Sequence, residues 1–420
     1  MITKPTLGAN PPGALIACQF CDNQAISELL FLGYLPPVNS LKSANVDSNE
    51  CPTFALSFSH CESCSLTQLS NILPREVVFP ESYPYLSGMT KSLVENFIDQ
   101  AKKATKVLQL QSSDLVVDIG SNDGSLLKQY INVSKILGVE PTQAADVANA
   151  HGVPTIKSYF DYATVDYIVE NHGKAKLITA CNVFAHIPDL HRLMENIVKL
   201  LDKDGVFISE SHYLVDLVEN LQFDTIYHEH LRFYTVFFLK KLMTSYGLEI
   251  FKVDNIQSHG GSIRVWAAKS GTFKIEDSVN EFVKKEVSKY ISIEDLNMFS
   301  SQVKQWRQEF KYLISDIRKN GGSISAIGAP SRASTLVSYS GLTENDLNSV
   351  AELPGSSKIG HFMPGTRILI SEEKEVLSSQ PDYLLILSWH LANEIIPKLK
   401  SKGFKGKFIL PLPKPRIIEL

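Results

Sequence analysis

The stretch from residue 115 to residue 211 alternates short apolar runs with segments long enough for helices, and this rhythm constrains the fold most. The runs are LVVDIG, KILGVE, KLITACN and GVFISES, at residues 115–120, 135–140, 176–182 and 205–211. Buried strands joined through helices form open, mostly parallel sheets. The sequence therefore predicts an α/β fold with such a sheet. Two later runs predict an antiparallel hairpin that closes the same domain, at residues 248–256 and 261–269.

The remaining chain supplies at least one more core. A length of 420 residues is typical of two or three domains. A second α/β rhythm begins with SISAIGAPSRASTLVSY and continues through apolar runs at 367–370 and 382–389, and a polar helical stretch at about 279–319 precedes it. We therefore expect three domains, with boundaries at 1–75, 76–270 and 271–420.

Charge and hydrophobicity exclude several kinds of partner. The chain has 41 Lys and Arg against 45 Asp and Glu, a formal net charge of -4. No summed positive field attracts nucleic acid or anionic lipid, so we expect neither nucleic acid nor membrane as a partner. The chain has no run of ~18 apolar residues, and its first twenty residues lack the features of a secretory signal. We expect a cytoplasmic monomer or homodimer.

Two Cys-x-x-Cys pairs near the start predict a metal site. Cys18 and Cys21 form one pair, and Cys61 and Cys64 form the other. Four thiolates are a tetrahedral set that Zn²⁺ prefers at structural sites. A redox pair needs only one such motif, and simple burial of thiols is the other alternative. The paired spacing favours structural zinc, with an inserted excursion between the pairs that contains Cys51.

A Gly-rich turn after the first apolar run predicts a nucleoside site. Gly120, Asn122 and Asp123 lie in DIGSNDGS, and Glu140 ends the next run, where a carboxylate can bind ribose hydroxyls. The turn lacks the GxGxxG spacing of a pyrophosphate cradle and is acidic. S-adenosylmethionine, which carries an amino acid and a cationic sulfur, is therefore favoured over NAD. An ordinary strand–helix turn is the alternative.

Two segments concentrate groups suited to proton transfer. His186 follows the run 176–182, and the segment YHEH brings together Tyr227, His228, Glu229 and His230. Histidine suits proton transfer near neutral pH. A metal site would prefer the HExxH spacing, and a solvated polar loop would not need the flanking aromatic residues. The pattern favours acid–base chemistry in a partly buried site.

Together these motifs resemble those of the C-methyltransferases that act on nucleotide-linked 4-keto deoxysugars. The resemblance covers nearly the whole chain and rests on the paired CxxC motifs, VVDIGSNDGSLL, NVFAHIPDL, YHEHLRFYT, HGGSIRVW, GAPSRASTL and PDYLLILSW. It implies a small zinc-binding N-terminal domain, a central class I methyltransferase domain with a Rossmann-like fold, and a C-terminal Rossmann-like domain that holds much of the sugar nucleotide. S-adenosylmethionine and structural Zn²⁺ are the implied cofactors.

The resemblance also implies the roles of particular residues. The S-adenosylmethionine site would comprise Gly120, Asn122, Asp123, Glu140, Phe160 and Asn182. The residues that face the reacting sugar would be His186, Tyr227, Glu229, His230 and a tyrosine of SYPYLSG, either Tyr83 or Tyr85. In the C-terminal domain, the GAPSRASTL loop stands where the family has a sequence similar to GAPAKGNTL. Its Ser331, Arg332 and Thr335 would bind substrate, with Arg332 as the phosphate-binding cation.

The chemistry of C-methylation explains these groups. A sugar carbon becomes nucleophilic when a base removes its proton next to a ketone, and donors must stabilise the enolate oxygen. We assign His230 as the base, with Tyr227 as the alternative, and expect Glu229 to orient or polarise the imidazole. His186 or Tyr83 would stabilise the enolate oxygen. The sulfonium supplies the electrophile, so no catalytic metal is required.

The sequence thus predicts methyl transfer to a carbon, expected to be C3, of a dTDP- or GDP-linked 4-keto deoxysugar in deoxysugar biosynthesis. O- or N-methylation of a sugar or small metabolite is the alternative within enzymes, since it needs a base but no ketone. A non-catalytic zinc-ribbon interaction protein is the alternative outside enzymes. An interaction scaffold has no reason to concentrate the YHEH groups beside a nucleoside cleft, which favours the enzyme.

Overall fold

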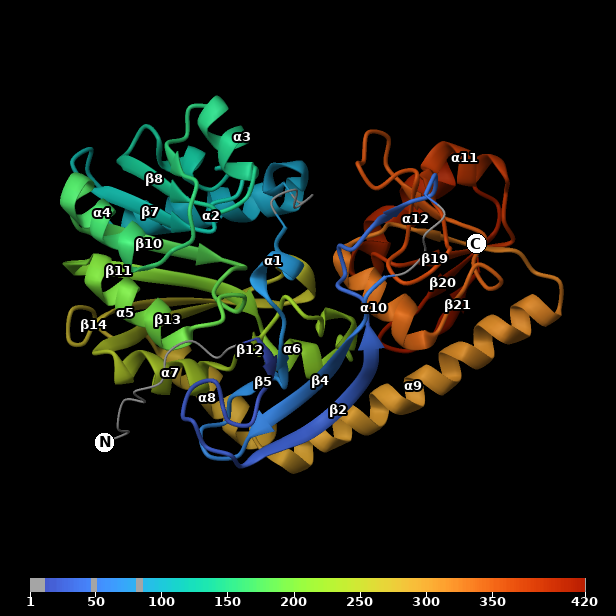
Figure 1. Ribbon diagram of the computed structural model, residues 1–420, viewed down its shortest axis with the longest axis horizontal. Coiled ribbons are helices and arrows are strands. Elements are labelled where there is room, and N and C mark those ends of the chain that lie inside the picture. Colours follow the sequence, from blue (N-terminus) through green and yellow to red (C-terminus); the bar gives the residue numbers. More distant parts are fainter. Residues whose placement is uncertain (1–11, 47–50, 81–85, 420) are drawn as a thin grey trace.

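The computed structural model describes residues 12–46, 51–80 and 86–419. Its elements form three main sheets, with a long helix, residues 293–319, beside the N-terminal strands and the C-terminal sheet (Figure 1). The N-terminal strands are β1 (Gly13–Ala14), β2 (Ile26–Leu35), β3 (Lys42–Ser43), β4 (Phe54–Cys61), β5 (Thr67–Leu69) and β6 (Asn71–Ile72). Strands β2 and β4 are antiparallel, as are β4 and β5, so the zinc-type motifs lie on one small antiparallel sheet.

The central sheet has seven strands and confirms the predicted α/β fold. Its strands are β7 (Leu115–Ile119), β8 (Lys135–Val139), β9 (Thr155–Ile156), β10 (Ala175–Cys181), β11 (Leu201–His212), β13 (Leu248–Ile256) and β14 (Ser262–Lys269). The order is β13-β14-β11-β10-β7-β8-β9. Only the β13–β14 and β11–β14 pairings are antiparallel, so the predicted hairpin is confirmed. The carboxyl ends of the parallel strands meet at one edge, where open α/β sheets bind ligands.

Helices with one apolar face cover this sheet. They are α2 (Lys91–Leu108), α3 (Ala144–Ala150), α4 (Tyr162–His172), α5 (Leu190–Leu200) and α7 (Val236–Ser245). The same stretch of chain also contains α1 (Arg75–Val78), α6 (Leu214–Glu219) and the short 3₁₀ turns η1 (Ser87–Met89), η2 (Leu127–Tyr130), η3 (Phe223–Thr225) and η4 (Ser258–Gly260). In α2, Leu93, Phe97, Ala101, Ala104 and Leu108 are buried at three- and four-residue spacing. The helix ends where Gln109 adopts a left-handed conformation.

The C-terminal sheet repeats the α/β plan with the order β18-β16-β15-β19-β20-β21. Its strands are β15 (Ile324–Ile327), β16 (Val350–Glu352), β18 (Ile370–Glu372), β19 (Tyr383–Ile386), β20 (Lys407–Leu410) and β21 (Arg416–Ile418). The remaining elements here are α10 (Ser331–Ser340), β17 (His361–Phe362), α11 (Glu373–Ser378), η5 (Trp389–Leu391) and α12 (Ala392–Ser401). The strand predicted at 367–370 begins only at Ile370, because the chain before it pairs as an isolated bridge.

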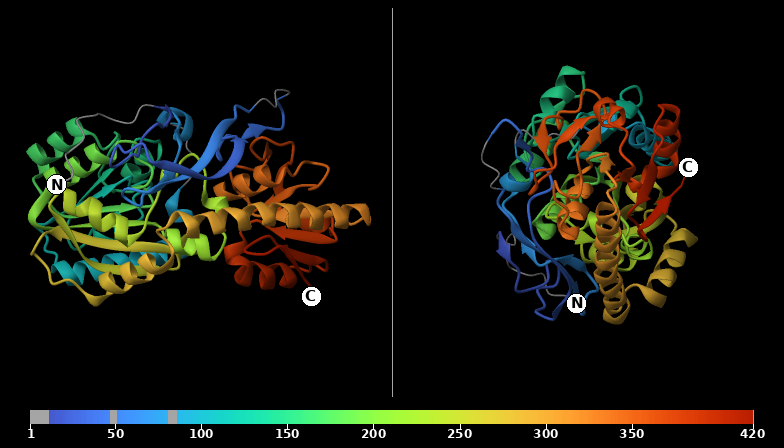
Figure 2. Two further views of the ribbon diagram at one scale, coloured as in Figure 1. Left: turned by 90° about the horizontal axis from the view of Figure 1, so that it is seen from below. Right: turned by 90° about the vertical axis from the view of Figure 1, so that its right-hand side faces the viewer.

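Two helices form the predicted polar stretch between the central and C-terminal sheets. They are α8 (Asp277–Lys289) and α9 (Ile293–Lys319), and the hydroxyl of Ser292 caps α9 by accepting a bond from the Asp295 amide. Figure 2 shows α9 running beneath the C-terminal sheet. Its buried face includes Trp306, whose indole donates to the Pro411 carbonyl at 2.7 Å. Within residues 12–46, 51–80 and 86–419, no helix combines the length and apolarity needed to span a membrane.

The N-terminal strands also pair with segments from both later parts of the chain. Strand β5 is antiparallel to β12 (Arg232–Phe233), which directly follows the YHEH segment. Strand β3 is antiparallel to β17. The apolar core beneath β2 and β4 is shared with α6, α9 and α10. A segment too small to build its own core is therefore stabilised by the surfaces on either side of it, and it fixes where YHEH lies.

Candidate active site

A cavity of about 830 Å³ lies where the three parts of the chain meet. Its walls come from the carboxyl edge of the central sheet, from the YHEH segment and from the α10 and η5 region of the C-terminal part. The sequence-predicted residues on its walls are Gly120, Asn122, Glu140, Phe160, Asn182, His186, Tyr227, Glu229, His230, Ser331 and Arg332. The fold thus brings most of the predicted residues to one space, which is large enough for two ligands of nucleoside size.

The Gly120 loop is built for close approach of a ligand. Gly120 has φ of +65°, and a Cβ at this position would lie 2.5 Å from Cγ2 of Val183. Glu140 fixes the loop from the next strand: its carboxylate accepts bonds from the Asn122 amide at 3.1 Å and from the Thr142 amide at 2.9 Å. The loop therefore packs closely against the Val183 side chain, and only glycine fits at position 120 without a shift of one of the two.

The predicted cofactor residues differ in what they contact. Phe160 forms an apolar part of the wall and is 9% exposed. The carboxylate of Asp123 accepts from the amides of Gly88 and Ser125 at 2.8 and 3.2 Å, and Asp123 is not among the cavity-lining residues. Its side chain anchors the η1 turn next to the loop. The Asp123 carboxylate therefore binds backbone amides of the protein and does not face the cavity.

The remaining donor set fits S-adenosylmethionine. Gly120, which has no room for a Cβ, the Glu140 carboxylate and the apolar Phe160 all line the cavity. These are respectively suited to the amino acid end, the ribose hydroxyls and the adenine of the cofactor. The cavity wall here presents acidic and aromatic groups. These groups favour a cationic ligand over a negatively charged diphosphate, because a carboxylate repels the latter.

We expect Gly120→Ala to weaken S-adenosylmethionine binding and to lower the melting temperature. Overpacking of this kind costs about 1–3 kcal/mol, so the dissociation constant should rise about tenfold or more. Gly152→Ala is a matched control, because Gly152 also has positive φ, +78°, but a Cβ there meets nothing within 4 Å. Both variants incur the strain of positive φ. Isothermal titration with S-adenosylhomocysteine and a thermal scan measure the difference, and equal losses in the two variants would contradict the close-approach role.

His230 is held in a single tautomer at the cavity wall. Its Nδ1 lies 2.7 Å from the carbonyl oxygen of Thr225 in η3. A carbonyl only accepts, so Nδ1 carries the proton and the Nε2 lone pair is free to act as a base. His230 is 5% exposed, and burial holds its pKa well below the usual histidine value. The imidazole is therefore neutral at neutral pH, as a base requires.

Aromatic rings surround this base. The Tyr227 ring centroid is 3.9 Å from that of His230, and the His186 centroid is 5.0 Å away. His186 also stacks on Phe79 at 5.5 Å. Burial lowers the pKa of His186 to about 4. This ring is therefore also neutral at neutral pH, and its N–H group is an uncharged hydrogen-bond donor. The structure thus brings together three of the residues assigned to the reacting sugar.

Glu229 connects the site to the N-terminal segment. Its Oε1 accepts a bond from Nδ2 of Asn39 at 2.8 Å, and Oδ1 of Asn39 accepts from the hydroxyl of Ser331 at 3.1 Å. This contact joins three distant segments at the cavity wall. The expectation that Glu229 orients or polarises an imidazole stays a prediction. Tyr83 and Tyr85 lie outside the described residues.

Arg332 is not a free phosphate-binding cation, contrary to the sequence prediction. Its Nε and Nη2 donate to the two carboxylate oxygens of Asp224 at 2.8 and 2.7 Å, and Nη1 donates to the His259 carbonyl at 3.0 Å. The guanidinium also covers the Trp389 ring at 4.9 Å. The buried Asp224 carboxylate in η3 neutralises the charge of the guanidinium. Arg332 thus joins α10 to η3, the turn that precedes the YHEH segment. Thr335, predicted to bind substrate, is 2% exposed within α10 and does not line the cavity.

We expect Asp224→Asn to lower the free energy of unfolding by about 3–5 kcal/mol, because it leaves the Arg332 charge buried without its counter-ion. Glu95→Gln is the matched control. The Lys91–Glu95 pair, with 3.7 Å between Nζ and Oε1, has side chains 91% and 63% exposed, and such pairs contribute only about 0–1 kcal/mol. Urea unfolding followed by tryptophan fluorescence compares the two. A loss below 1 kcal/mol in Asp224→Asn would contradict the fastening role.

Sequence reasoning missed several polar groups in the cavity wall. They are His212, His259, Glu352, Lys358 and His390. Nζ of Lys358 donates to the Ala329 carbonyl at 2.5 Å, and burial lowers its pKa. His259 opens the HGGSIRVW motif, but neither it nor the other four was assigned a role from the sequence. The position of His212 at the end of the fourth predicted apolar run is the one sequence signal that pointed toward the ligand edge.

The four paired cysteines converge on a point. Their Sγ atoms lie within 4.8 Å of one another, with Cys18 and Cys64 separated by 3.5 Å and Cys21 and Cys61 by 3.6 Å. Four sulfurs each ~2.3 Å from one central ion would be separated by ~3.8 Å, so the set fits tetrahedral Zn²⁺. Cys51 lies outside this set, near the Ser40 carbonyl. With four thiolates the site is structural, as predicted.

Comparisons with known proteins match three consecutive stretches of the chain. A zinc binding domain family matches residues 18–79, a methyltransferase domain family matches 94–253, and a C-methyltransferase C-terminal domain family matches 257–413. Two solved structures are similar to the central part. An S-adenosylmethionine-dependent methyltransferase from Clostridium acetobutylicum is 16% identical with a TM-score of 0.35, and the match covers 42% of this chain and 92% of that one. Magnesium protoporphyrin IX methyltransferase from Synechocystis PCC 6803 with bound SAM is 12% identical with a TM-score of 0.33, and the match covers 43% of this chain and 80% of that one.

The whole chain also has a curated relative. C-methyltransferase NovU from Streptomyces niveus is 31% identical over 409 residues, which cover 96% of each chain. The strand order of the central sheet is that of a class I methyltransferase, whose methyl donor is S-adenosylmethionine, and the cysteine set is that of a structural zinc site. The chain therefore belongs to the C-methyltransferase family, as an S-adenosylmethionine-dependent enzyme with a zinc-binding N-terminal part.

Proposed function

We propose that this enzyme methylates a carbon, C3, next to the ketone of a dTDP- or GDP-linked 4-keto deoxysugar, in deoxysugar biosynthesis. The observation that carries the proposal is the fixed tautomer of His230, whose Nδ1 donates to the Thr225 carbonyl. A free Nε2 lone pair on a neutral, buried imidazole can remove a C–H proton next to a ketone. Such a base would be unnecessary for a nucleophile that is already electron-rich, such as an amine.

The neighbours of His230 suit the enolate that would form. As the C–H bond breaks, its electron pair moves to the ketone oxygen, and neutral donors lower the energy of that charge. The His186 imidazole and the Tyr227 hydroxyl group belong to the two rings that approach His230 at 5.0 and 3.9 Å. When bound at the Gly120 wall, S-adenosylmethionine supplies the electrophilic methyl group.

The C-terminal wall would receive the nucleotide part of the substrate. Because Asp224 neutralises Arg332, we propose Lys358 and Ser331 as the groups that face the diphosphate. Lys358 lines the cavity, and its Nζ donates to the Ala329 carbonyl. This acceptor is a neutral carbonyl, whereas Arg332 donates to a carboxylate, so a diphosphate oxygen can take the place of the carbonyl on Lys358.

Mass spectrometry with a panel of dTDP-, GDP- and CDP-linked 4-ketosugars tests the proposal. One member should gain a single methyl group on carbon, and in D₂O it should exchange the C–H next to the ketone when S-adenosylhomocysteine replaces the methyl donor. A methyl group found on oxygen or nitrogen, or methylation without any exchange in D₂O, would overturn C-methylation of a ketosugar.

A further inference from the structure

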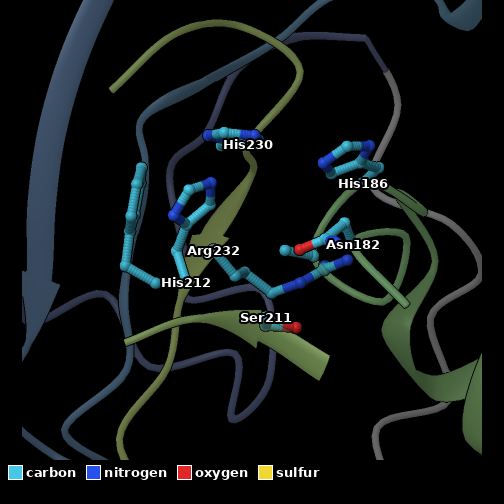
Figure 3. Close-up of a pocket in the computed structure, with 8 residues that line it drawn as sticks. Asn182, His186, Ser211, His212, His230 and Arg232 are labelled. Carbon is cyan, nitrogen blue, oxygen red and sulfur yellow. The ribbon is translucent and has the colours of Figure 1, made fainter. Parts of the chain in front are cut away.

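A second, much smaller cavity lies beside His230. It has a volume of about 10 Å³, close to what one water molecule needs. Figure 3 shows the polar side chains around it, with the His212 and His230 rings next to each other, Asn182 near His186, Ser211 below, and the Arg232 side chain extending toward Asn182. Oγ of Ser211 and Oδ1 of Asn182 are buried and have no hydrogen-bond partner among the described residues. Unpartnered buried oxygens are costly, and a bound water is the usual way to satisfy them.

His212 is the histidine nearest to the base that the methylation chemistry does not use. Its ring centroid is 4.8 Å from that of His230 and 5.8 Å from that of His259. It extends from the end of β11, directly after Ser211. Burial holds the pKa of His212 well below the usual value, and His230, His259, Arg332 and His186 also lower it. His212 is therefore a neutral imidazole with a free lone pair.

The reaction leaves a proton that the site must release. When His230 takes the C–H proton it becomes an imidazolium in a buried place that already disfavours positive charge. Methyl transfer converts the cationic donor into a neutral thioether, so one proton per turnover has to leave the enzyme. An imidazolium that kept this proton could return it to the enolate or block the next turnover.

We propose that one ordered water in the small cavity, held by Ser211 and Asn182, carries the proton from His230 to His212. The Nε2–H bond of His230 breaks as a water O–H bond forms, and another O–H bond of the same water breaks as an N–H bond forms on His212. The water and His230 are regenerated, and His212 then passes the proton toward His259. His212 is thus a positioning and proton-accepting residue that acts through His230. This inference rests on the proposed C-methylation.

Deuterium washout separates proton release from proton removal. The substrate is the ketosugar that the panel shows to be methylated, deuterated next to the ketone, and the enzyme carries S-adenosylhomocysteine. His212→Asn should slow washout into H₂O at least about tenfold, because the deuteron stays on His230 and returns. Single-turnover methylation with S-adenosylmethionine should remain within about threefold of the native rate, since it does not await release. Ser211→Ala should show the same split to a smaller extent.

His151→Asn is the control, because His151 is an exposed residue at the end of α3. Native washout in His212→Asn would overturn the relay. Equal losses of washout and single-turnover methylation would overturn it too, since they indicate a structural role. A crystal structure of the ligand-free native enzyme should show one water bonded to Ser211 and Asn182, and a cavity without it would exclude a water carrier. If no ketosugar is methylated, the proposed function fails instead.

Discussion

Replacing His230 by glutamine should reduce methyl transfer by about 10²–10⁴-fold, the usual contribution of a general base. Glutamine keeps a side-chain amide that can donate to the Thr225 carbonyl, the bond that His230 makes at 2.7 Å. The fold should therefore persist, while the lone pair that accepts the proton is lost. Binding of S-adenosylhomocysteine should remain within about threefold, because the Gly120 wall is a different part of the cavity. Steady-state kinetics and calorimetry measure the two effects.

The pH dependence gives an independent check on the same residue. Burial holds the pKa of His230 in the folded enzyme well below the ordinary value of 6.5. A base works when it is unprotonated, so activity should persist as the pH falls through 6.5 and should decline only at lower pH. An acid limb centred near 6.5 would instead point to an exposed histidine as the base.

His228→Gln is the matched comparison for His230→Gln. Both histidines are buried in the YHEH segment, and burial lowers the pKa of His228 to about 4. The ring of His228 faces the N-terminal sheet, with Nε2 3.3 Å from the Phe54 carbonyl. Its replacement should lower stability more than it lowers the rate of C–H exchange. If His228→Gln abolished exchange and His230→Gln did not, the base assignment would be wrong.

Local patterns predicted the elements and motifs because each depends on neighbours in sequence. The apolar runs at 115–120 and 176–182 correspond to β7 and β10, and the runs at 248–256 and 261–269 to the β13–β14 hairpin. Each CxxC turn places its own two thiols together, and the pairing of β2 with β4, where Ile26 lies opposite Cys61, brings the two turns to one point. In such cases hydrophobic periodicity or fixed spacing determines the local structure.

Contacts between distant segments escaped prediction. The sequence suggested a phosphate ligand for Arg332, yet Asp224, 108 positions away, neutralises its charge. His212 received no role from the sequence, and β11 places its ring centroid 4.8 Å from that of His230. The pairing of β5 with β12 joins the N-terminal sheet to the active-site segment. The spacing of residues in the sequence predicts none of these contacts, because each depends on how the domains pack. A role assigned from residue type alone, such as phosphate binding by Arg332, therefore left out the actual neighbour.

Cys61→Ser should remove zinc and lower the melting temperature by about 10–20 °C. Structural zinc sites contribute folding free energy directly, and a loss of several kcal/mol changes the melting temperature by this amount in a domain of moderate size. The Cys61 and Cys64 turn lies between β4 and β5, and Cys18, Phe20, Cys61 and Cys64 belong to the core of the central sheet. Metal analysis and calorimetry test this. Cys51→Ser, a substitution outside the cluster, should change neither quantity, and native zinc content in Cys61→Ser would contradict the site.

The same variant should also lose activity, although the four clustered cysteines do not line the cavity. Gln19, the residue after Cys18, donates to the Leu231 carbonyl at 3.3 Å and accepts from Nη1 of Arg232 at 2.8 Å. Zinc at the cysteine cluster would therefore fix the Cys18–Cys21 loop, which holds Leu231 and the start of β12 just after His230. Zinc loss should raise the KM for the ketosugar and lower kcat, while S-adenosylhomocysteine still binds the Gly120 wall. Retained kcat in a zinc-free protein would show that the pairing of β5 with β12 orders the YHEH segment without the metal.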